Sequence, residues 1–377
     1  MLGKVFEELL EVEDRKSKGA FYTPREIVHY MCQESLINYL ATELNATEEE
    51  KLNGHSEQSE ESHCHSELVS ESITFKIMKE KEFINIIKNT LKSDYIGDDC
   101  AYLPDLGIVV TQDSLVEGVH FSLDFATPYQ LGWKSAMVNI SDVCASGAEP
   151  KYLTVALSLP KNIDTGFVED FYKGLQDACG DVQVVGGDIT GSDKIFISVT
   201  AIGKTEGRKI SSRKFAKVGQ KIVVSGKHGS SSAGLKLLQD TKIKSDTLIN
   251  AHLMPVAQKD FSCLVATKQK NDYAMMDTSD GLADALSQIA EASGVNLEID
   301  FSKIPYDKEL ESFENFEDLI LYGGEDYQLV ATVDEDVVKD FIVIGEVKSG
   351  SGITIIKQHE KINLSKQDVE KKLFNHF

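Results

Sequence analysis

The chain has 377 residues, of which 41% are hydrophobic, and this is enough material for two or three domains with sizeable cores. It carries 61 Asp and Glu against 39 Lys and Arg, a formal net charge of -22. Such acidity argues against a surface that coats nucleic acid and against docking on anionic lipid. Carboxylates that hold divalent metal ions nevertheless allow an acidic chain to handle phosphates.

Targeting signals and paired cysteines are not visible. Residues 1–20 carry charges throughout, and no stretch approaches the roughly 18 consecutive apolar residues of a membrane span. The cysteines form no C-x-x-C pair, so the sequence predicts a reduced, cytoplasmic protein with free thiols. They are Cys32, Cys64, Cys100, Cys144, Cys179 and Cys263.

The first 77 residues differ from the rest in composition and in the spacing of their apolar residues. Residues 1–45 have apolar side chains at three- and four-residue spacing and predict a helical extension, with Thr23 and Pro24 opening its second helix. Residues 46–77 predict an acidic, disordered linker, because residues 46–72 hold eight Glu and one Lys, a local charge of -7. A soft-metal site at the histidines and cysteine of residues 55–65 is a less favoured alternative.

From residue 78 onward the pattern predicts an α/β protein. Short apolar strands alternate with helical segments, and a new strand at 221–225 opens a second α/β domain. We place the domain boundary near residue 210, giving an N-terminal domain at 78–210 and a C-terminal domain at 211–377. The expected strands are 107–111, 152–159, 182–185 and 195–202, and the expected helices are 129–144, 168–179 and 282–292.

Acidic residues beside Gly, Ser or Thr recur where strands are expected to end. Mg²⁺ prefers oxygen ligands, and glycine beside a carboxylate lets the backbone approach a phosphate. Any single motif is also compatible with a turn or a helix N-cap, and residues 277–280 in particular with a cap for the helix 282–292. The motifs are Gly97-Asp98-Asp99, Thr111-Gln112-Asp113-Ser114, Asn139-Ile140-Ser141-Asp142, Gly186-Gly187-Asp188, Asp277-Thr278-Ser279-Asp280 and Gly323-Gly324-Glu325-Asp326.

In order and spacing, these motifs resemble the bacterial thiamine-monophosphate kinase family over about residues 78–377. The run from Asp113 to Phe121 and the terminal Asn375-His376-Phe377 point to this family within the wider aminoimidazole ribonucleotide synthetase-like superfamily. The resemblance implies an α/β (α+β) fold of two domains, with mixed sheets flanked by helices. It also implies a homodimer in which the N-terminal domains pair their sheets.

The resemblance further implies transfer of a phosphoryl group from ATP to thiamine monophosphate, giving thiamine diphosphate and ADP. This is the last step of thiamine diphosphate biosynthesis. Several Mg²⁺ ions would screen the repulsion between the two anionic substrates, and no P-loop or activated nucleophile is required. Nucleic acid and membranes are not expected partners of the kinase body.

Residue roles carry over by matching motifs. The implied metal ligands are Asp99, Thr111, Gln112, Asp113, Asp142, Asp188, Asp277 and Asp280. The implied ATP-binding residues are Tyr172, Gly187, Asp188, Arg213 and Ser279. The implied contacts to thiamine monophosphate are His120, Glu325 and Phe374, and Asp113, Asp142 and Arg213 are the implied catalytic residues. His120, Phe374 and Tyr172 also have a simpler interpretation as packing residues.

Three departures from the family pattern stand out. Gln112 replaces a threonine, which is compatible with ligation through its backbone carbonyl alone. The family's Asp after Gly229 is Ser230, and a basic residue after Pro255 is lost at Gln258. These changes concern efficiency more than identity.

Residues 15–28 resemble the Tyr-Thr-Pro segment that precedes the core of restriction-modification DNA methyltransferases. The chain has no Asn-Pro-Pro-Tyr motif, so DNA methylation is not inferred. Two other functions remain as alternatives. One is a related ATP-dependent enzyme of the same superfamily with another small acceptor, and the other is a degenerate fused interaction or DNA-associated protein.

Overall fold

The structure, a computed structural model, describes residues 80–239, 245–358 and 360–373. All of these residues belong to one compact unit, Lys76–Phe377. The predicted helical extension 1–45, the predicted linker 46–77 and Phe374 lie outside the described residues. The methyltransferase-like segment is outside them as well.

The first half of the described chain builds a five-stranded mixed sheet with the order β1-β2-β5-β3-β4. Neighbouring strands are antiparallel, except for the parallel pair β3 and β4. The elements are α4 (Glu80–Leu91), β1 (Ala101–Leu103), β2 (Ile108–Val116), α5 (Pro128–Ala145), β3 (Glu149–Leu159), α6 (Thr165–Cys179), β4 (Gln183–Gly191) and β5 (Phe196–Lys204).

The second half builds a seven-stranded mixed sheet with the order β12-β11-β8-β10-β6-β9-β7, in which only β8 and β11 pair in parallel. Its strands are β6 (Lys221–Val224), β7 (Met275–Asp277), β8 (Asn296–Asp300), β9 (Leu329–Val333), β10 (Ile342–Lys348), β11 (Gly352–Lys357) and β12 (Glu360–Leu364). Its α-helices are α7 (Ser230–Gln239), α8 (Asp246–Leu253), α9 (Lys259–Lys268), α10 (Leu282–Ser293), α11 (Phe316–Tyr322) and α12 (Lys366–Glu370). The short 3₁₀ helices are η1 (Arg213–Phe215), η2 (Phe301–Lys303), η3 (Lys308–Ser312) and η4 (Glu335–Asp340).

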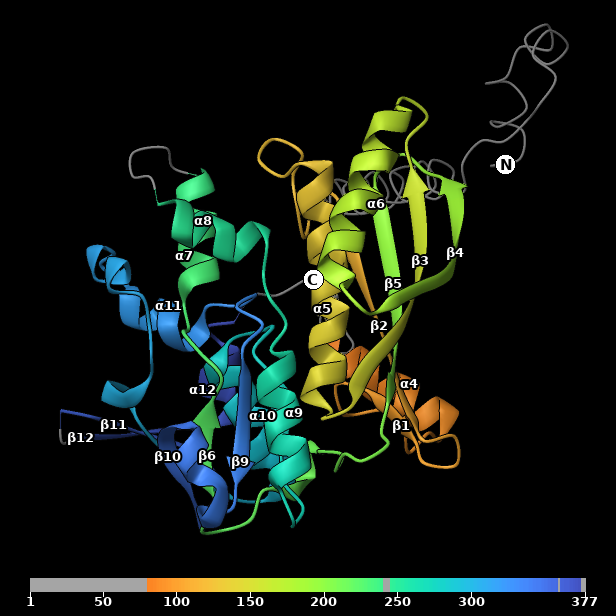
Figure 1. Ribbon diagram of the computed structural model, residues 1–377. Helices are drawn as coiled ribbons and strands as arrows, with labels where there is room; N and C mark the ends of the chain where they lie inside the picture. The colour runs from red at the N-terminus through yellow and green to blue at the C-terminus, as the bar shows by residue number, and fades with distance from the viewer. Residues whose placement is uncertain (1–79, 240–244, 359, 374–377) are drawn as a thin grey trace, which may run out of the picture. The chain divides into compact units, whose positions relative to one another are not determined.

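Helix α5 lies between the two sheets (Figure 1). It begins with a capping box in which Thr127 and Gln130 satisfy each other's backbone amides, and Pro128 occupies the first turn. Every residue from 134 to 141 is buried, so no face of this stretch meets solvent. The helix contacts β2, β3 and β5 on one side and β7, α8 and α9 on the other. A helix buried on all sides acts as a structural centre.

One hydrophobic core therefore runs through α5 from the first sheet into the second. It includes Leu153 and Val199 of the first sheet together with Val223, Met275 and Leu329 of the second. A separate core packs α10 and α11 against the remainder of the second sheet. The two halves are joined by buried apolar contact, which is the dominant favourable term in folding.

The mixed two-sheet architecture predicted from the sequence is confirmed. The predicted helices 129–144 and 168–179 are α5 and α6, and the predicted strand 221–225 is β6. Strand β4 is longer than the predicted 182–185, because the Gly-Gly-Asp motif lies inside it rather than after it. The capping interpretation of residues 277–280 is wrong, because the N-cap of α10 is Gly281, which has no side-chain cap.

Two further findings concern the described residues alone. None of their helices is both long enough and apolar enough to cross a membrane. Four cysteines in this part of the chain are free thiols, namely Cys100, Cys144, Cys179 and Cys263.

Helices α5 and α6 approach each other through glycines, and this contact is testable. A Cβ on Gly132 would lie 1.9 Å from the carbonyl oxygen of Phe171, and a Cβ on Gly174 would lie 1.9 Å from that of Tyr129. We expect Gly132→Ala and Gly174→Ala each to lower the free energy of unfolding by about 2 kcal/mol or more, although alanine is the better helix former. Chemical denaturation measures the change.

Gly166→Ala, in the exposed first turn of α6, is the control, because a Cβ there would meet only the Asp164 side chain, at 3.3 Å. Equal effects at all three glycines would contradict the proposed close approach of the two helices.

Candidate active site between the two sheets

Strand β2 and helix α5 bring the first acidic side chains together. Side chains alternate along a strand, so Thr111 and Asp113 share one face of β2. The Thr111 hydroxyl donates to Asp142 Oδ2 at 2.7 Å, and the amide of Asp113 donates to Asn139 Oδ1 at 2.9 Å. Because the side-chain partner of Thr111 lies on α5, the face of β2 that carries Thr111 and Asp113 is directed toward the helix.

Asp277 reaches the same place from the second sheet. It is the last residue of β7, and its Oδ2 accepts a hydrogen bond of 2.7 Å from the Ser141 hydroxyl on α5. Its Oδ1 accepts from the hydroxyl of Ser279 at 3.0 Å. The α5 helix thus holds an acidic residue from each sheet.

Three carboxylates meet at this point. Oxygen atoms of Asp99, Asp142 and Asp277 all lie within 4.8 Å of one another. Burial and then the neighbouring charges, of which Asp113 is the largest, raise the pKa of Asp142 well above its ordinary value. Burial and then Asp99 raise the pKa of Asp277 to about 7. Carboxylates buried this close together are either protonated or compensated by a cation, and an all-oxygen donor set suits Mg²⁺.

Arg213 supplies part of the positive charge. Its Nη2 donates to Asp99 Oδ1 at 2.8 Å, and its Nη1 donates to Gln288 on α10. Its backbone amide is bound by Asp98, which fixes η1 beside the carboxylates. Its Nε is buried and has no hydrogen-bond partner among the described residues. The Nε–H group therefore lacks an acceptor within this part of the chain, although the atom itself is enclosed.

Glu325 lies in a second polar group at the other end of α5. The Lys134 ammonium is 3.0 Å from Glu325 Oε1, and His252 Nδ1 is 3.3 Å from Oε2. Burial opposes ionisation, but Lys134 and His252 hold the pKa of Glu325 below its ordinary value, with a smaller contribution from His120. His120 Nδ1 accepts the amide of Val116 at 3.0 Å, so Nε2 carries the proton of the neutral ring. The charge of Glu325 is thus influenced by His120, and the shared contact of these two residues with thiamine monophosphate stays a prediction.

Three other predicted residues lie on the sheet away from the three carboxylates. Gln112 faces the opposite side of β2, where its amide binds Ser198 and Thr200. Asp188 is exposed on the edge strand β4, which is separated from β2 by β5 and β3. It pairs with Ala156 of β3, and the register across the sheet places it on the same face as Gln112. Gly187 allows close contact with β3, because a Cβ there would lie 1.9 Å from the Val155 carbonyl oxygen. Within one copy of the chain, Asp188 is not brought to the carboxylates, and its metal role stays a prediction.

The remaining predicted residues differ in their surroundings. Tyr172 on α6 is half-buried and packs against the first core. Asp280 is exposed in the loop before α10. Ser279 lies at the site, since its amide and hydroxyl contact Asp277 and its carbonyl accepts the Glu325 amide at 2.7 Å.

Several residues at the site were missed by sequence reasoning. Lys134 had a visible signal, because it is a charged residue inside an otherwise apolar helical pattern. Asp326 was within a recognised motif but had no assigned role. Its carboxylate accepts the amides of Gly229 and Ser231 at the start of α7, at 2.5 and 2.8 Å. Burial raises the pKa of Asp326 to about 7.

The chain matches known protein families and curated relatives. Residues 97–205 match the family described as AIR synthase related protein, N-terminal domain, and residues 217–358 match the corresponding C-terminal domain. The chain is 39% identical to the thiamine-monophosphate kinase of Aquifex aeolicus, over 74% of this chain and 95% of that protein. It is 33% identical to that of Bacillus subtilis, over 75% of this chain and 93% of the relative. The chain belongs to the thiamine-monophosphate kinase family.

Solved structures agree with this family membership. AaThiL complexed with AMPPCP and TMP is 37% identical, with a TM-score of 0.72, and the match covers 81% of this chain and all of that one. A HypE-HypF complex matches at 21% identity with a TM-score of 0.64 over 75% of this chain and 98% of that one, which shows a shared fold alone. The family resemblance predicted from the sequence is confirmed for the kinase body.

Two of this chain's departures from the family pattern lie at the starts of helices α7 and α9. Ser230 and Ser231 begin α7 at the amides bound by Asp326, and Ser231 Oγ lies 3.1 Å from His252 Nδ1. Ser230 stands where the family has an aspartate, and its hydroxyl donates a hydrogen bond to Asp307 in a neighbouring loop. Gln258 is the N-cap of α9.

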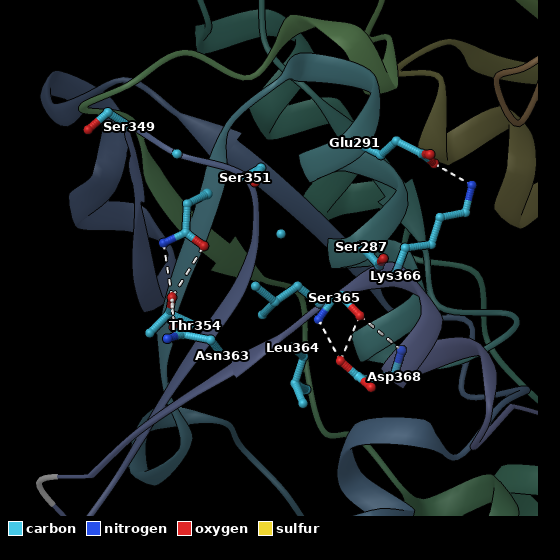
Figure 2. A pocket seen from close by; sticks show the side chains of 14 residues that line it. Ser287, Glu291, Ser349, Ser351, Thr354, Asn363, Leu364, Ser365, Lys366 and Asp368 are labelled. Atoms are coloured by element: carbon cyan, nitrogen blue, oxygen red, sulfur yellow. Dashed lines mark hydrogen bonds and ion pairs between the residues drawn. The ribbon is translucent and has the colours of Figure 1, made fainter.

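A separate hollow of about 640 Å³ lies between α10, β11, β12 and α12 (Figure 2). Its polar groups largely satisfy one another. Thr354 bonds Asn296 and Asn363, Ser365 caps α12 with Asp368, and Lys366 pairs with a glutamate of α10. None of the predicted site residues lines it, so the carboxylate site is the better candidate for chemistry.

The crowded carboxylates predict an unusual pH dependence for the metal-free protein. An acid whose folded pKa exceeds its unfolded value binds more protons when folded, so stability falls as pH rises. For Asp277 this window extends from about pH 4 to about pH 7. We expect the Tm of EDTA-treated protein to be several degrees lower at pH 8 than at pH 5.5, and Mg²⁺ to restore more of it at pH 8.

Asp142→Asn should raise the Tm of the metal-free protein at pH 8 and reduce the stabilisation by Mg²⁺, because it removes one repelling charge. A lower Tm for Asp142→Asn at that pH, with Mg²⁺ stabilisation unchanged, would contradict this view of the cluster.

Proposed function

We propose that this protein is a thiamine-monophosphate kinase. An oxygen of the thiamine monophosphate phosphate attacks the γ-phosphorus of ATP, the bond from that phosphorus to the β,γ-bridging oxygen breaks, and ADP leaves with thiamine diphosphate as the other product. Family membership supports the substrate pair. The observation that carries the proposal is the meeting of Asp99, Asp142 and Asp277 at the junction of the two sheets.

The donor set at this junction fits Mg²⁺. The carboxylates are close together and largely enclosed. Burial is the main cause of their raised pKa values, and neighbouring carboxylates add to it. Asp99, Asp142 and Asp277 would hold the ion, with Asp113 beside them. Bound there, Mg²⁺ would neutralise charge on the reacting phosphates.

The chain's own residues then align the substrates. Arg213 is fixed by Asp98, Asp99 and Gln288, and its guanidinium, on a side chain that is 18% exposed, is the donor we assign to a phosphate oxygen of ATP. Ser279 binds Asp277 and, through its backbone, Glu325, so it links the phosphate end of the site to the acceptor end. Holding both reactants in line is the main contribution a protein makes to this chemistry.

The remaining assignments are part of the same proposal. Tyr172, Gly187 and Asp188 would bind the nucleotide, Thr111, Gln112, Asp188 and Asp280 would complete the metal sites, and His120, Glu325 and Phe374 would contact thiamine monophosphate. A metal role for Asp188 needs a separate ion or a second copy of the chain, since this side chain faces away from the three carboxylates.

We also propose a cytoplasmic homodimer that pairs the sheets of the N-terminal domains. All nine residues of the edge strand β4 are exposed, including Val185 and Ile189. An exposed edge strand presents unpaired backbone groups that suit pairing with another chain. The free thiols of the described cysteines suit a reducing compartment.

The proposal predicts that purified protein with ATP and Mg²⁺ converts thiamine monophosphate to thiamine diphosphate and ADP. Asp113→Asn and Asp142→Asn should each lower kcat by about 100-fold or more, because each removes charge that organises the reacting phosphates. Chromatographic quantification of both products measures the rates.

Asp105→Asn, in the exposed turn between β1 and β2, is the matched control and should keep wild-type activity. Near-wild-type turnover by Asp142→Asn at limiting Mg²⁺ would show that the assignment is wrong, and wild-type inactivity towards thiamine monophosphate would overturn the function itself.

A further inference from the structure

Glu325 is already paired within the protein. Lys134 Nζ is 3.0 Å from one carboxylate oxygen and 3.1 Å from the other, and the Lys134 side chain is only 4% exposed. The Glu325 side chain is 27% exposed. The ammonium thus neutralises the carboxylate from the buried side and leaves part of Glu325 open to the site.

His252 adds a hydrogen bond without adding charge. Burial and then Lys134 lower the pKa of His252 to about 4, so the ring is neutral near pH 7. Its Nδ1 faces both Glu325 Oε2 and the Ser231 hydroxyl. An unprotonated Nδ1 would set its lone pair against the carboxylate, so the geometry favours the tautomer in which Nδ1–H donates to Glu325.

The backbone of Glu325 is also constrained. Its φ of 64° lies in the left-handed region, as does that of Tyr327 at 49°. The Glu325 amide is bound to Ser279, and a Cβ on the preceding Gly324 would lie 2.6 Å from the Ser279 carbonyl oxygen. Non-glycine residues keep such a conformation only where the surroundings enforce it, and such sites often serve function.

We propose that Lys134 and His252 are positioning residues that hold Glu325 as a charge-neutralised hydrogen-bond acceptor. The site then recognises a neutral hydrogen-bond donor on the acceptor substrate, rather than that substrate's cationic ring. This inference rests on the proposed function, and in thiamine monophosphate the neutral donor is the amino group of the pyrimidine.

The spacing of Lys134 and Asp142 along α5 fits an acceptor substrate whose pyrimidine lies at Glu325. Lys134 and Asp142 are eight residues apart, which is about 12 Å along a helix. The phosphate of an extended acceptor can therefore lie at the carboxylates while its pyrimidine reaches Glu325. A free carboxylate would instead favour the positive thiazolium, but the charge of Glu325 is taken up by Lys134.

The test compares thiamine monophosphate with its 4′-oxo analogue, which keeps the thiazolium charge and replaces the amino donor by an oxo group. Wild-type protein should prefer the amino compound by about tenfold or more in kcat/KM, because a site built to accept a hydrogen bond rejects an analogue that cannot donate one. Glu325→Gln should reduce this preference, since an amide can donate to the oxo group. Equal use of both compounds by wild-type protein would overturn the proposal.

The positioning role is tested through KM. Lys134→Met should raise the KM for thiamine monophosphate about tenfold and leave the KM for ATP within about twofold, and Lys134→Arg should restore part of the loss. His252→Leu should act in the same direction with a smaller effect. A lower Tm for Lys134→Met without any change in the KM for thiamine monophosphate would mean a merely structural role, and would overturn the proposal.

The double variant Lys134→Met/Glu325→Gln covers the case in which Lys134→Met folds poorly. It removes both buried charges, so we expect a higher Tm than for Lys134→Met and a reduced preference for the amino compound. A double variant that keeps the full wild-type preference would overturn the proposal. Failure of wild-type protein to turn over either compound is a different result and would overturn the proposed function.

Discussion

The burial of α5 between two sheets is the constraint on which the rest of the site depends. A polar side chain on a helix without a solvent face must find its partner on a neighbouring element. Lys134 finds Glu325, Asn139 binds the backbone of Asp113, Ser141 binds Asp277, and Asp142 accepts from Thr111. One helix thereby fixes residues from both halves of the chain relative to one another.

The two ends of α5 lie in different electrostatic environments. Around Asp142, carboxylates from three separate segments are gathered, and among the described residues Arg213 is the cation that pairs with one of them, so this end calls for added positive charge. Around Lys134, one buried cation meets one carboxylate and a neutral histidine, so the charges already balance. The first arrangement suits phosphates accompanied by metal ions, and the second suits an uncharged ring.

Sequence reasoning predicted the acidic cluster better than its surroundings. Asp99, Asp142 and Asp277 lie in short motifs. The expected strand 107–111 is too short, because β2 runs from Ile108 to Val116, and the two-residue period of this strand separates Gln112 from Thr111 and Asp113. Lys134 and Glu325 are 191 residues apart in the chain, and no local sequence pattern predicts a contact over that separation. The orientation of Asp188 depends on the register between β3 and β4, which contains an irregularity after Leu153 that the sequence does not signal. Long-range pairing and strand register are set by tertiary packing, and this is where prediction from local pattern ends.

Counting bound divalent cations tests the central claim most directly. Mn²⁺ titration followed by electron paramagnetic resonance, without nucleotide, reports free ion and hence ion bound per chain. If Asp99, Asp142 and Asp277 form a cation site, wild-type protein should bind at least one Mn²⁺ per chain in competition with Mg²⁺, and Asp142→Asn should weaken this binding by about tenfold or more. Identical titration curves for the two proteins would contradict the account.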